Sequence, residues 1–326
     1  FVFMVGTCFS QGKAQTKSAV SYKNPVVDIA MPDPTVIKAA DGYFYVYATE
    51  STRNVPIMKS KDLVQWTYCN TAFTNKTRPR FEPKAGIWAP DINYINNKYV
   101  LYYAMSVWGG EQTCGIGVAT ANSPQGPFTD HGKMFRSNEI GVQNSIDPSL
   151  LQYEGRNYLV WGSFRGIYVI ELTADGLSIM SGAKKKRIAG TAFEAVYIHK
   201  HGDYYYRFAS IGSCCQGVKS TYKVVVGRSK KVWGPYKDKT GKPMLKNGYS
   251  LVIGANDHFV GNGHGSQIIQ DDAGQDWLLY HGFSRSTPEN GRILLLDQIK
   301  WDQEGWPYVE GGSPSYETQK APVFNN

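Results

Sequence analysis

Five segments of the chain share one pattern, and this repetition constrains the fold more than any other feature. Each segment begins with a polar residue, passes through a turn signal and ends in a strand rich in aromatic and β-branched side chains. The polar residues that begin the segments are Asp33, Asp91, Asp147, Glu194 and His264. Repeats of this kind indicate stacked or radial units that bury their apolar faces against one another.

Turn signals and further strands extend each segment into a unit of about four strands. Turn-forming pairs such as Asp41-Gly42 and Glu154-Gly155 lie between the first two strands of a unit. Another alternating segment follows each hairpin, as at residues 223–227. The units recur at roughly 45 to 70 residues, in the range of propeller blades, and no stretch shows sustained helical periodicity. We therefore expect an all-β fold, a five-bladed β-propeller with four-stranded antiparallel blades.

Other architectures fit the pattern less well. A TIM barrel needs helices between its strands, whereas Gly, Pro and Asn fill these intervals. Two packed β-sandwiches would explain the strands but not the fivefold recurrence of polar residues. We expect residues 17–326 to form a single catalytic propeller, with a loose tail from about residue 311. Residues 20–28 either add a strand to the last blade or leave a packed seam where the ring closes.

The first 16 residues have the character of a targeting segment. They contain a short apolar run, followed by a cleavage-like Ala14-Gln15, which is typical of a partial secretory signal. Cys8 is alternatively the lipid-accepting residue of a bacterial lipoprotein. We therefore expect export in a bacterium, to the periplasm, the medium or the cell surface. No other apolar run reaches the ~18 residues that a transmembrane span requires.

The charge and the cysteine content argue against two kinds of binding partner, nucleic acid and thiolate-bound zinc. The formal net charge is +8, but no arginine-rich arm or recognition helix accompanies it, so nucleic acid is not expected. The cysteines include no CxxC pair, which argues against a zinc site built from thiolates. Cys214 and Cys215 are adjacent, and form either a vicinal disulfide or two separate thiols. A monomer is expected.

The five polar residues predict a site as well as a fold. In a propeller the loops that enter the innermost strands open on one rim, so all five side chains should converge there. Carboxylates that share a buried pocket have pKa values that are pushed apart, which leaves one protonated and another ionised. Glycoside hydrolysis needs such a proton donor and such a carboxylate. For a single Asp-Pro pair, turn formation is the simpler explanation, whereas the repeated set favours a site.

Five phrases surround these polar residues, and a longer phrase follows the fourth. They are Asp33-Pro-Thr-Val, Trp88-Ala-Pro-Asp91-Ile, Ile146-Asp147-Pro-Ser-Leu, Glu194-Ala-Val-Tyr-Ile and Gly263-His264-Gly. These phrases resemble those of family 43 glycoside hydrolases, through essentially all of residues 25–310. The phrase from Ser213 to Tyr222, followed by Val226-Gly-Arg-Ser229, is similar to that of the endo-1,5-α-L-arabinanases within the family. The resemblance implies a five-bladed propeller that acts with inversion.

The resemblance also implies roles for three carboxylates. Asp33 would be the general base, Glu194 the general acid, and Asp147 the residue that orients Glu194 and keeps its pKa raised. An inverting enzyme places its base and acid on opposite faces of the sugar, about 6.5–9.5 Å apart. The first and fourth of five blades are not neighbours, so Asp33 and Glu194 can face each other. The charge of Asp147, one blade before Glu194, would resist ionisation of the acid.

Four further residues are expected to contact the substrate. Asp91 would accept hydrogen bonds from sugar hydroxyls, Trp88 would offer a ring face, and Ser145 would also line the site. Arg292 resembles a family arginine near Asp147, where its charge would keep Asp147 ionised. Packing between blades is the alternative role for Trp88, and a surface position on an outer strand is the alternative for Arg292.

His264 is the one member of the set that is not acidic. The resemblance implies that it reaches a hydrated cation, often calcium, in the central channel, and we expect the contact to run through water. No EF-hand spacing is present, so such a site is of another kind. His281 is expected to be structural. The glycines of residues 261–265 lack the βαβ context of a nucleotide-binding loop, so no organic cofactor is expected.

The resemblance implies an inverting hydrolase that cleaves internal α-1,5-L-arabinofuranosidic bonds of arabinan, a side chain of pectin, and the repeated carboxylates are consistent with glycoside hydrolysis. An exo-acting α-L-arabinofuranosidase or β-xylosidase on the same fold is the first alternative. A propeller that binds glycans without catalysis is the second, although Asp33, Asp147 and Glu194 are all present.

Overall fold

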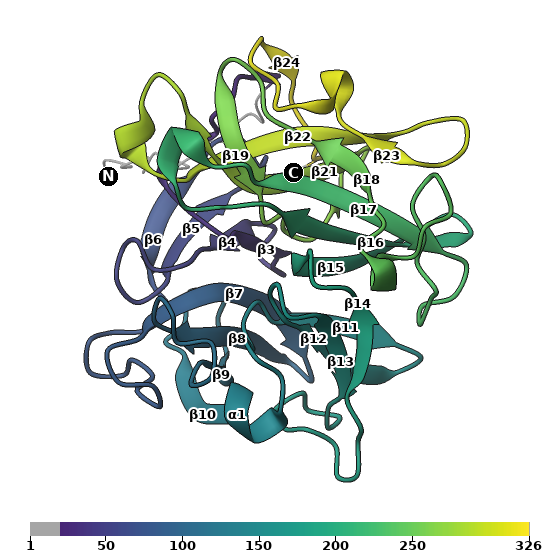
Figure 1. Ribbon diagram of the computed structural model, residues 1–326. Helices are drawn as coiled ribbons and strands as arrows, with labels where there is room; N and C mark the ends of the chain where they lie inside the picture. The colour runs from purple at the N-terminus through teal and green to yellow at the C-terminus, as the bar shows by residue number, and fades with distance from the viewer. Residues whose placement is uncertain (1–19, 326) are drawn as a thin grey trace, which may run out of the picture.

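Five antiparallel sheets follow one another around a ring in the computed structural model, which describes residues 20–325 (Figure 1). Each of the first four sheets is continuous in sequence. Blade 1 contains β3 (Thr35–Lys38), β4 (Phe44–Tyr47), β5 (Pro56–Ser60) and β6 (Thr67–Thr71). Blade 2 contains β7 (Gly86–Ile95), β8 (Lys98–Ser106), β9 (Gly115–Ala121) and β10 (Thr129–Arg136). Blade 3 contains β11 (Ser149–Tyr153), β12 (Arg156–Trp161), β13 (Ile167–Glu171) and β14 (Lys186–Ala189). Blade 4 contains β15 (Glu194–His201), β16 (Tyr204–Ile211), β17 (Lys223–Ser229) and β18 (Ser250–Ile253).

Blade 5 joins the two ends of the chain. Its strand order is β19 (Phe259–Gly263), β21 (Asp276–Ser284), β22 (Ile293–Trp301) and β2 (Val27–Ala30), with β20 (Ile269–Gln270) on β21 and β23 (Pro307–Tyr308) on β22. In the register of the closing pair, Val27 lies opposite Leu294 and Ala30 opposite Ile293. Of the two closure modes expected from the sequence, the added strand is therefore the one found.

Burial explains why the second strand of each blade is a nearly continuous apolar run. All four residues of β4 and all nine of β21 are buried, because each of these strands is covered on both faces by neighbouring blades. The fourth strands lie at the periphery, and β10 accordingly alternates between exposed and less exposed residues. The confirmed prediction of a five-bladed propeller rests on this gradient and on the aromatic and β-branched content of the inner strands.

The core is divided into clusters, each shared by two adjacent blades. Tyr47 of blade 1 packs with Leu101 of blade 2, for example, and Phe208 of blade 4 packs with Leu278 of blade 5. Equivalent clusters join blades 2 and 3, blades 3 and 4, and blades 5 and 1. Packing of each blade against both neighbours fixes the ring and therefore the positions of the loops at its rim.

The segment after residue 311 is not a loose tail over its described part. In a two-stranded sheet, β24 (Gln319–Lys320) pairs with β1 (Ser21–Tyr22). Phe324 is 7% exposed, and its ring lies 4.7 Å from that of Phe44 between centroids. The expectation from its polar composition was wrong because a few apolar residues anchor it to blade 1.

Helices are few and short. They are α1 (Ser137–Ile140) and the 3-10 turns η1 (Gly217–Lys219), η2 (Met244–Lys246), η3 (Pro288–Asn290) and η4 (Glu310–Gly312). Among residues 20–325, no helix has the length and apolar character that crossing a bilayer requires. The expected targeting segment of residues 1–16, with Cys8, lies outside the described residues.

Candidate active site

A pocket of about 770 Å³ brings together loops from all five blades. Some lining residues precede or begin an innermost strand, and others lie in the loops between second and third strands. Its lining includes the predicted Asp33, Asp147, Glu194, His264, Arg292 and Trp88. The convergence expected from the repeat is thus found for four of the five polar residues, the exception being Asp91.

The polar residues do not share one register, which corrects the sequence interpretation. One residue at the start of each inner strand, or just after it in blade 5, has a left-handed backbone. These residues are Asp33 (φ 54°), Ala89 (φ 39°), Asp147 (φ 55°), Ala195 (φ 53°) and His264 (φ 48°). Relative to this position Glu194 lies one residue earlier and Asp91 two residues later. Non-glycine residues seldom adopt this conformation, so the shared backbone marks the true repeat.

Asp33 is a buried carboxylate that accepts strong donors. Thr49 Oγ1 donates to its Oδ2 at 2.6 Å, Arg292 Nη1 donates to its Oδ1 at 2.8 Å, and His264 Nδ1 lies 3.3 Å from Oδ1. Burial alone would raise the pKa of Asp33. The positive charges of Arg292 and His264 outweigh burial and hold that pKa well below its usual range. Asp33 is therefore ionised in the folded protein at pH values near neutrality.

The contact of Arg292 corrects a second expectation. Arg292 was expected beside Asp147, but it is bonded to Asp33 instead. It lies just before β22 in blade 5, and blade 5 is the neighbour of blade 1 in the closed ring. Asp147 therefore lacks the cation that was expected to keep it ionised.

Glu194 is the first residue of β15 and is 7% exposed. Ser163 Oγ donates to its Oε2 at 2.6 Å, and the Tyr222 hydroxyl donates to its Oε1. Burial raises the pKa of Glu194, and these two donors and the charge of His264 offset the effect only in part. Asp33 and Glu194 thus have pKa values displaced in opposite directions.

Asp147 contacts the backbone beside Glu194. Its Oδ2 accepts a hydrogen bond of 3.1 Å from the N–H of Ala195, the residue in the left-handed conformation after Glu194. Burial raises the pKa of Asp147 to about 8; the charge of His264 opposes this, and those of Glu194 and Asp33 add to it. Asp147 and Glu194 therefore retain at least one proton between them at neutral pH.

Two histidines surround Asp33 and differ in charge. Burial disfavours the charged form of His264, but the carboxylates of Asp33, Asp147 and Glu194 outweigh it and raise its pKa to about 9. His281 is fully buried, and its Nδ1 accepts the backbone N–H of Asp33 at 3.0 Å, so that nitrogen carries no proton. Burial accordingly lowers the pKa of His281 to about 4. His281 is a structural residue that holds the backbone of Asp33.

Asp91 and Ser145 do not occupy the expected positions. Asp91 lines a smaller cavity of about 20 Å³ in the channel, together with Thr35, Asp147, His264 and Gln267. Its carboxylate accepts hydrogen bonds from Asn93 Nδ2 (2.7 Å), the N–H of Leu150 (2.8 Å) and Gln267 Nε2 (2.9 Å). Asp91 therefore connects blades rather than lining the main pocket, because its position is two residues further into the strand.

Ser145 is completely buried outside the pocket lining. Its hydroxyl donates to the carbonyl of Val142 at 2.8 Å and accepts from Trp161 Nε1 at 3.0 Å. These bonds satisfy the side chain inside the protein, so the expected contact with substrate is wrong.

Trp88 and Trp108 form an aromatic wall of the pocket. Trp88 packs against Ala104, Cys114 and Ile146 and also lines the pocket, so the packing role is found and the contact with a sugar ring stays a prediction. Its ring lies 5.4 Å from that of Trp108, which is 78% exposed. Aromatic faces of this kind suit the apolar faces of sugar rings. Trp108 lies in the loop between β8 and β9. The two glycines that follow it were the one feature of the sequence that could have identified it as a residue of an exposed loop.

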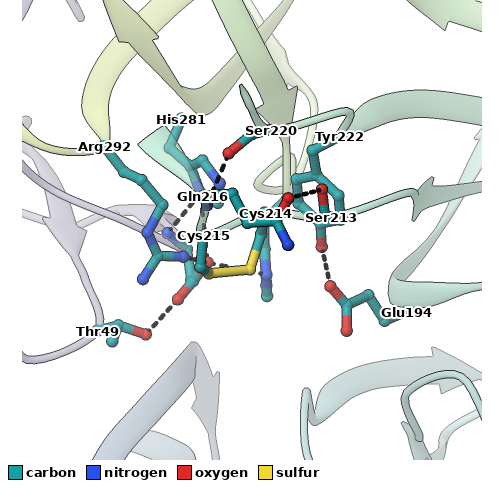
Figure 2. Close-up of a disulfide and its surroundings, with 12 residues drawn as sticks. Thr49, Glu194, Ser213, Cys214, Cys215, Gln216, Ser220, Tyr222, His281 and Arg292 are labelled. Atoms are coloured by element: carbon teal, nitrogen blue, oxygen red, sulfur yellow. Dashed lines mark hydrogen bonds and ion pairs between the residues drawn. A yellow bond between two sulfur atoms is a disulfide. The ribbon is translucent and has the colours of Figure 1, made fainter. Parts of the chain in front are cut away.

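Cys214 and Cys215 form a vicinal disulfide in the loop between β16 and β17. Both residues line the pocket, and Figure 2 shows the disulfide between Arg292 on one side and Glu194 with Tyr222 on the other. Of the two states left open by the sequence, the disulfide is the one found. This loop belongs to blade 4 and the tryptophans to blade 2, which is not its neighbour, so the disulfide and the indole rings line different parts of the pocket.

Sequence reasoning missed the residues whose hydrogen bonds adjust the pKa values of Asp33 and Glu194. Tyr222 closes the phrase that begins at Ser213, but nothing local indicated that its hydroxyl meets Glu194. Thr49 and Ser163 follow second strands in blades 1 and 3. Their shared position after a second strand is the one signal that could have identified them.

Comparisons with known proteins assign the sequence to a family. The sequence profile of Glycosyl hydrolases family 43 matches residues 22–307. The chain is 36% identical over 306 residues to an extracellular exo-α-(1->5)-L-arabinofuranosidase of Cellvibrio japonicus, covering 85% of this chain and 86% of that protein. It is also 36% identical over 289 residues to an extracellular endo-α-(1->5)-L-arabinanase of Bacillus subtilis, covering 84% and 86%.

Solved structures show the same similarity. The α-L-arabinanase of Cellvibrio cellulosa, complexed with arabinohexaose, superposes with a TM-score of 0.78 at 33% identity, covering 87% of this chain and 96% of that one. An endo-arabinanase of Bacillus licheniformis gives a TM-score of 0.75 at 31% identity, covering 88% and 99%. The fold, the site and the sequence thus lead to one family.

Proposed function

Because the chain belongs to glycosyl hydrolase family 43, we propose that it is an endo-1,5-α-L-arabinanase that hydrolyses internal bonds of arabinan with inversion. The observation that carries the chemistry is the opposite displacement of two buried pKa values. Arg292 and His264 lower the pKa of Asp33, whereas burial raises that of Glu194. One pocket therefore contains one carboxyl biased toward the ionised form and another biased toward the protonated form.

The mechanism follows from these two states. Asp33 takes a proton from a water molecule, which attacks the anomeric carbon, while Glu194 gives its proton to the leaving oxygen. Thr49 and Arg292 fix the carboxylate of Asp33, and Ser163 and Tyr222 fix that of Glu194. Asp147 orients Glu194 through the N–H of Ala195, and the protonation of the two carboxyls is linked by their mutual repulsion.

An endo mode is supported by two candidate binding surfaces of the pocket that belong to blades that are not neighbours. Trp88 and Trp108 lie in blade 2 and the disulfide in blade 4, with the carboxylates in the same pocket. A chain that contacts both surfaces would place an internal bond at the acid. Linear debranched arabinan should therefore give a ladder of oligomers before free arabinose accumulates.

Two measurements test the proposal directly. Proton NMR during turnover should show a product anomer opposite to that of the cleaved bond, and retention would remove the role of Asp33 as a base. Glu194→Gln should lower kcat by roughly 10²–10⁴ on arabinan and by less on aryl arabinosides with good leaving groups. Glu171→Gln, on an outer strand of blade 3, is the control. Binding of arabinan by the wild type without release of reducing ends would contradict the enzymatic function.

An exo-acting arabinofuranosidase is the second candidate. It is favoured by the 36% identity to the Cellvibrio japonicus relative, which equals the identity to the Bacillus subtilis endo-arabinanase. Release of one small product from the start, with no intermediate oligomers, would select this alternative.

We propose in addition that a calcium ion binds in the channel beside His264. The small cavity holds about one water-sized group and is lined by oxygen donors of Asp91, Asp147, Thr35 and Gln267. Burial raises the pKa of Asp91 to about 6, and a bound cation would favour the ionised form of this carboxyl. These donors fit a hard cation, which would lower the local negative potential; His264 would contact it through water.

A chelator should therefore lower the activity, and added calcium should restore it. His264→Gln should abolish this dependence. Unchanged activity of the chelated wild type would argue against the cation.

We also propose that the protein is exported and monomeric. Both of the bacterial relatives described above are named as extracellular. Cell fractionation with mass spectrometry of the mature N-terminus would distinguish cleavage within residues 1–16 from lipidation of Cys8. Light scattering would test the monomer.

A further inference from the structure

A second cluster of metal-binding side chains lies at the far end of the strand that carries Glu194. His199 and His201 are two residues apart in β15, so their side chains emerge from the same face. Asp276 at the start of β21 in blade 5 meets them there. One ligand atom from each of the three residues lies within 4.8 Å of the other two. With ~3.3 Å per residue, His201 is roughly 20 Å along the strand from Glu194.

The carboxylate of this cluster is held in place by its neighbours. Asp276 is 3% exposed. Trp301 Nε1 donates to its Oδ2 at 2.8 Å, and Gln270 Nε2 donates to its Oδ1 at 3.2 Å. Hydrogen-bond donors around a carboxylate orient it as a metal ligand. Each oxygen of Asp276 accepts one such bond and keeps a further lone pair that could bind an ion.

The two imidazoles are also oriented before any ion binds. The ring of His201 stacks on that of Trp301 with centroids 3.8 Å apart and an interplanar angle of 10°. The ring of His199 lies 6.2 Å from the same indole at 20°. His201 Nδ1 is 3.5 Å from Oδ2 of Asp276. One indole thus aligns both rings and donates to the carboxylate.

We infer that His199, His201 and Asp276 bind a divalent transition-metal ion of the zinc type, which connects blades 4 and 5. Two imidazole nitrogens and one carboxylate oxygen are a donor set that zinc prefers, whereas calcium prefers oxygen alone. The ion is therefore of a different class from the cation proposed beside His264. None of the three residues belongs to the described lining of the catalytic pocket.

The geometry leaves a small adjustment and one open position. Bonds of about 2.0–2.2 Å to a tetrahedral ion place the ligand atoms about 3.4 Å apart, which the three side chains reach by rotating toward one another from within 4.8 Å. The side chain of His201 is 37% exposed, so the ion enters from solvent and water fills the fourth position. An ion that binds the folded state stabilises it, so thermal stability should depend on zinc concentration.

The test uses tag-free, chelator-treated protein titrated with zinc in saturating calcium. Calorimetry should show one equivalent of zinc bound by the wild type, and cobalt in its place should give the visible absorption of a tetrahedral site. His201→Gln should weaken binding at least tenfold and remove the rise in Tm with zinc. His131→Gln alters a histidine on β10 of blade 2 and should leave both properties unchanged.

Asp276→Asn provides a second variant, because its amide oxygen still accepts from Trp301 while the charge is lost. It should weaken zinc binding as well. Hydrolysis of arabinan in the absence of zinc should be unchanged in His201→Gln, which shows that the fold is intact. No binding by the wild type, or equal binding by the wild type and His201→Gln, would overturn the assignment.

Discussion

Arg292 Nη1 donates a hydrogen bond of 2.8 Å to Oδ1 of Asp33, and this contact joins the last blade to the first at the catalytic pocket. The cation therefore acts on the carboxylate that the proposed mechanism requires to be ionised. Glu194 accepts its hydrogen bonds from the neutral hydroxyls of Ser163 and Tyr222. This asymmetry separates the pKa of the proposed base from that of the proposed acid more than burial does, because both carboxyls are buried.

Replacing Arg292 by Gln should shift the acid limb of the pH profile upward. The charge of Arg292 lowers the pKa of Asp33, so its loss raises that pKa, and the base becomes protonated at a higher pH. We expect a shift of about one unit or more in the acid limb of kcat/KM, equal to about 1.4 kcal/mol. Arg156→Gln, at an exposed pair with Glu171, is the control. Coincident acid limbs for wild type and Arg292→Gln would refute this role.

Replacing Tyr222 by Phe should move the alkaline limb instead. The hydrogen bond from Tyr222 lowers the pKa of Glu194, so its removal raises that pKa and keeps the acid protonated to higher pH. The limb should shift upward, while the acid limb set by Asp33 stays in place. Tyr68→Phe, at an exposed residue of β6, should change neither limb. A downward shift would contradict the assignment.

Replacing both Cys214 and Cys215 by Ser should affect binding more than chemistry. The disulfide lines the pocket, whereas the hydrogen bonds described above for Asp33 and Glu194 come from other residues. KM for arabinan should rise several-fold, with kcat within about twofold of the wild type, because the lost contact acts in both ground and transition states. Cys69→Ser, a free cysteine outside the pocket lining, should match the wild type. A large fall in kcat with constant KM would show that the disulfide acts on the chemistry.

Replacing Phe324 by Ala should destabilise the whole propeller. The ring is 7% exposed and packs on Phe44, so its removal should cost about 3 kcal/mol of unfolding free energy. Val323→Ala is a matched control, because Val323 is 46% exposed and its truncation should cost less than about 0.5 kcal/mol. Urea denaturation gives both values. Equal midpoints for the two variants would mean that this segment adds nothing to stability.

Local features made the blades predictable. Turn pairs such as Asp41-Gly42 and apolar runs such as Phe44 to Tyr47 predict strands from neighbouring residues alone. The assignment of Asp33, Asp147 and Glu194 to one site followed from ring geometry, and the pocket contains all three.

The residues that sequence reasoning misplaced depend on contacts between distant segments. Arg292 contacts Asp33 because blade 5 packs against blade 1. Phe324 is buried because it packs against Phe44 of blade 1. Asp91 was misplaced because the true repeat is a left-handed backbone position, occupied in its blade by Ala89. Alanine has no polar side chain, so the sequence pattern assigned this position to Asp91, the nearest carboxylate.

The strand that closes the ring has a consequence for biosynthesis. Of the strands that the structure describes, β2 is among the first to be synthesised, whereas its partner β22 is among the last. Blade 5 is therefore incomplete throughout translation, and so is the bond from Arg292 to Asp33. Contacts between such distant segments form slowly, because a long loop must close before they stabilise anything. Hydrolytic activity should consequently appear only after β22 has been synthesised and paired with β2.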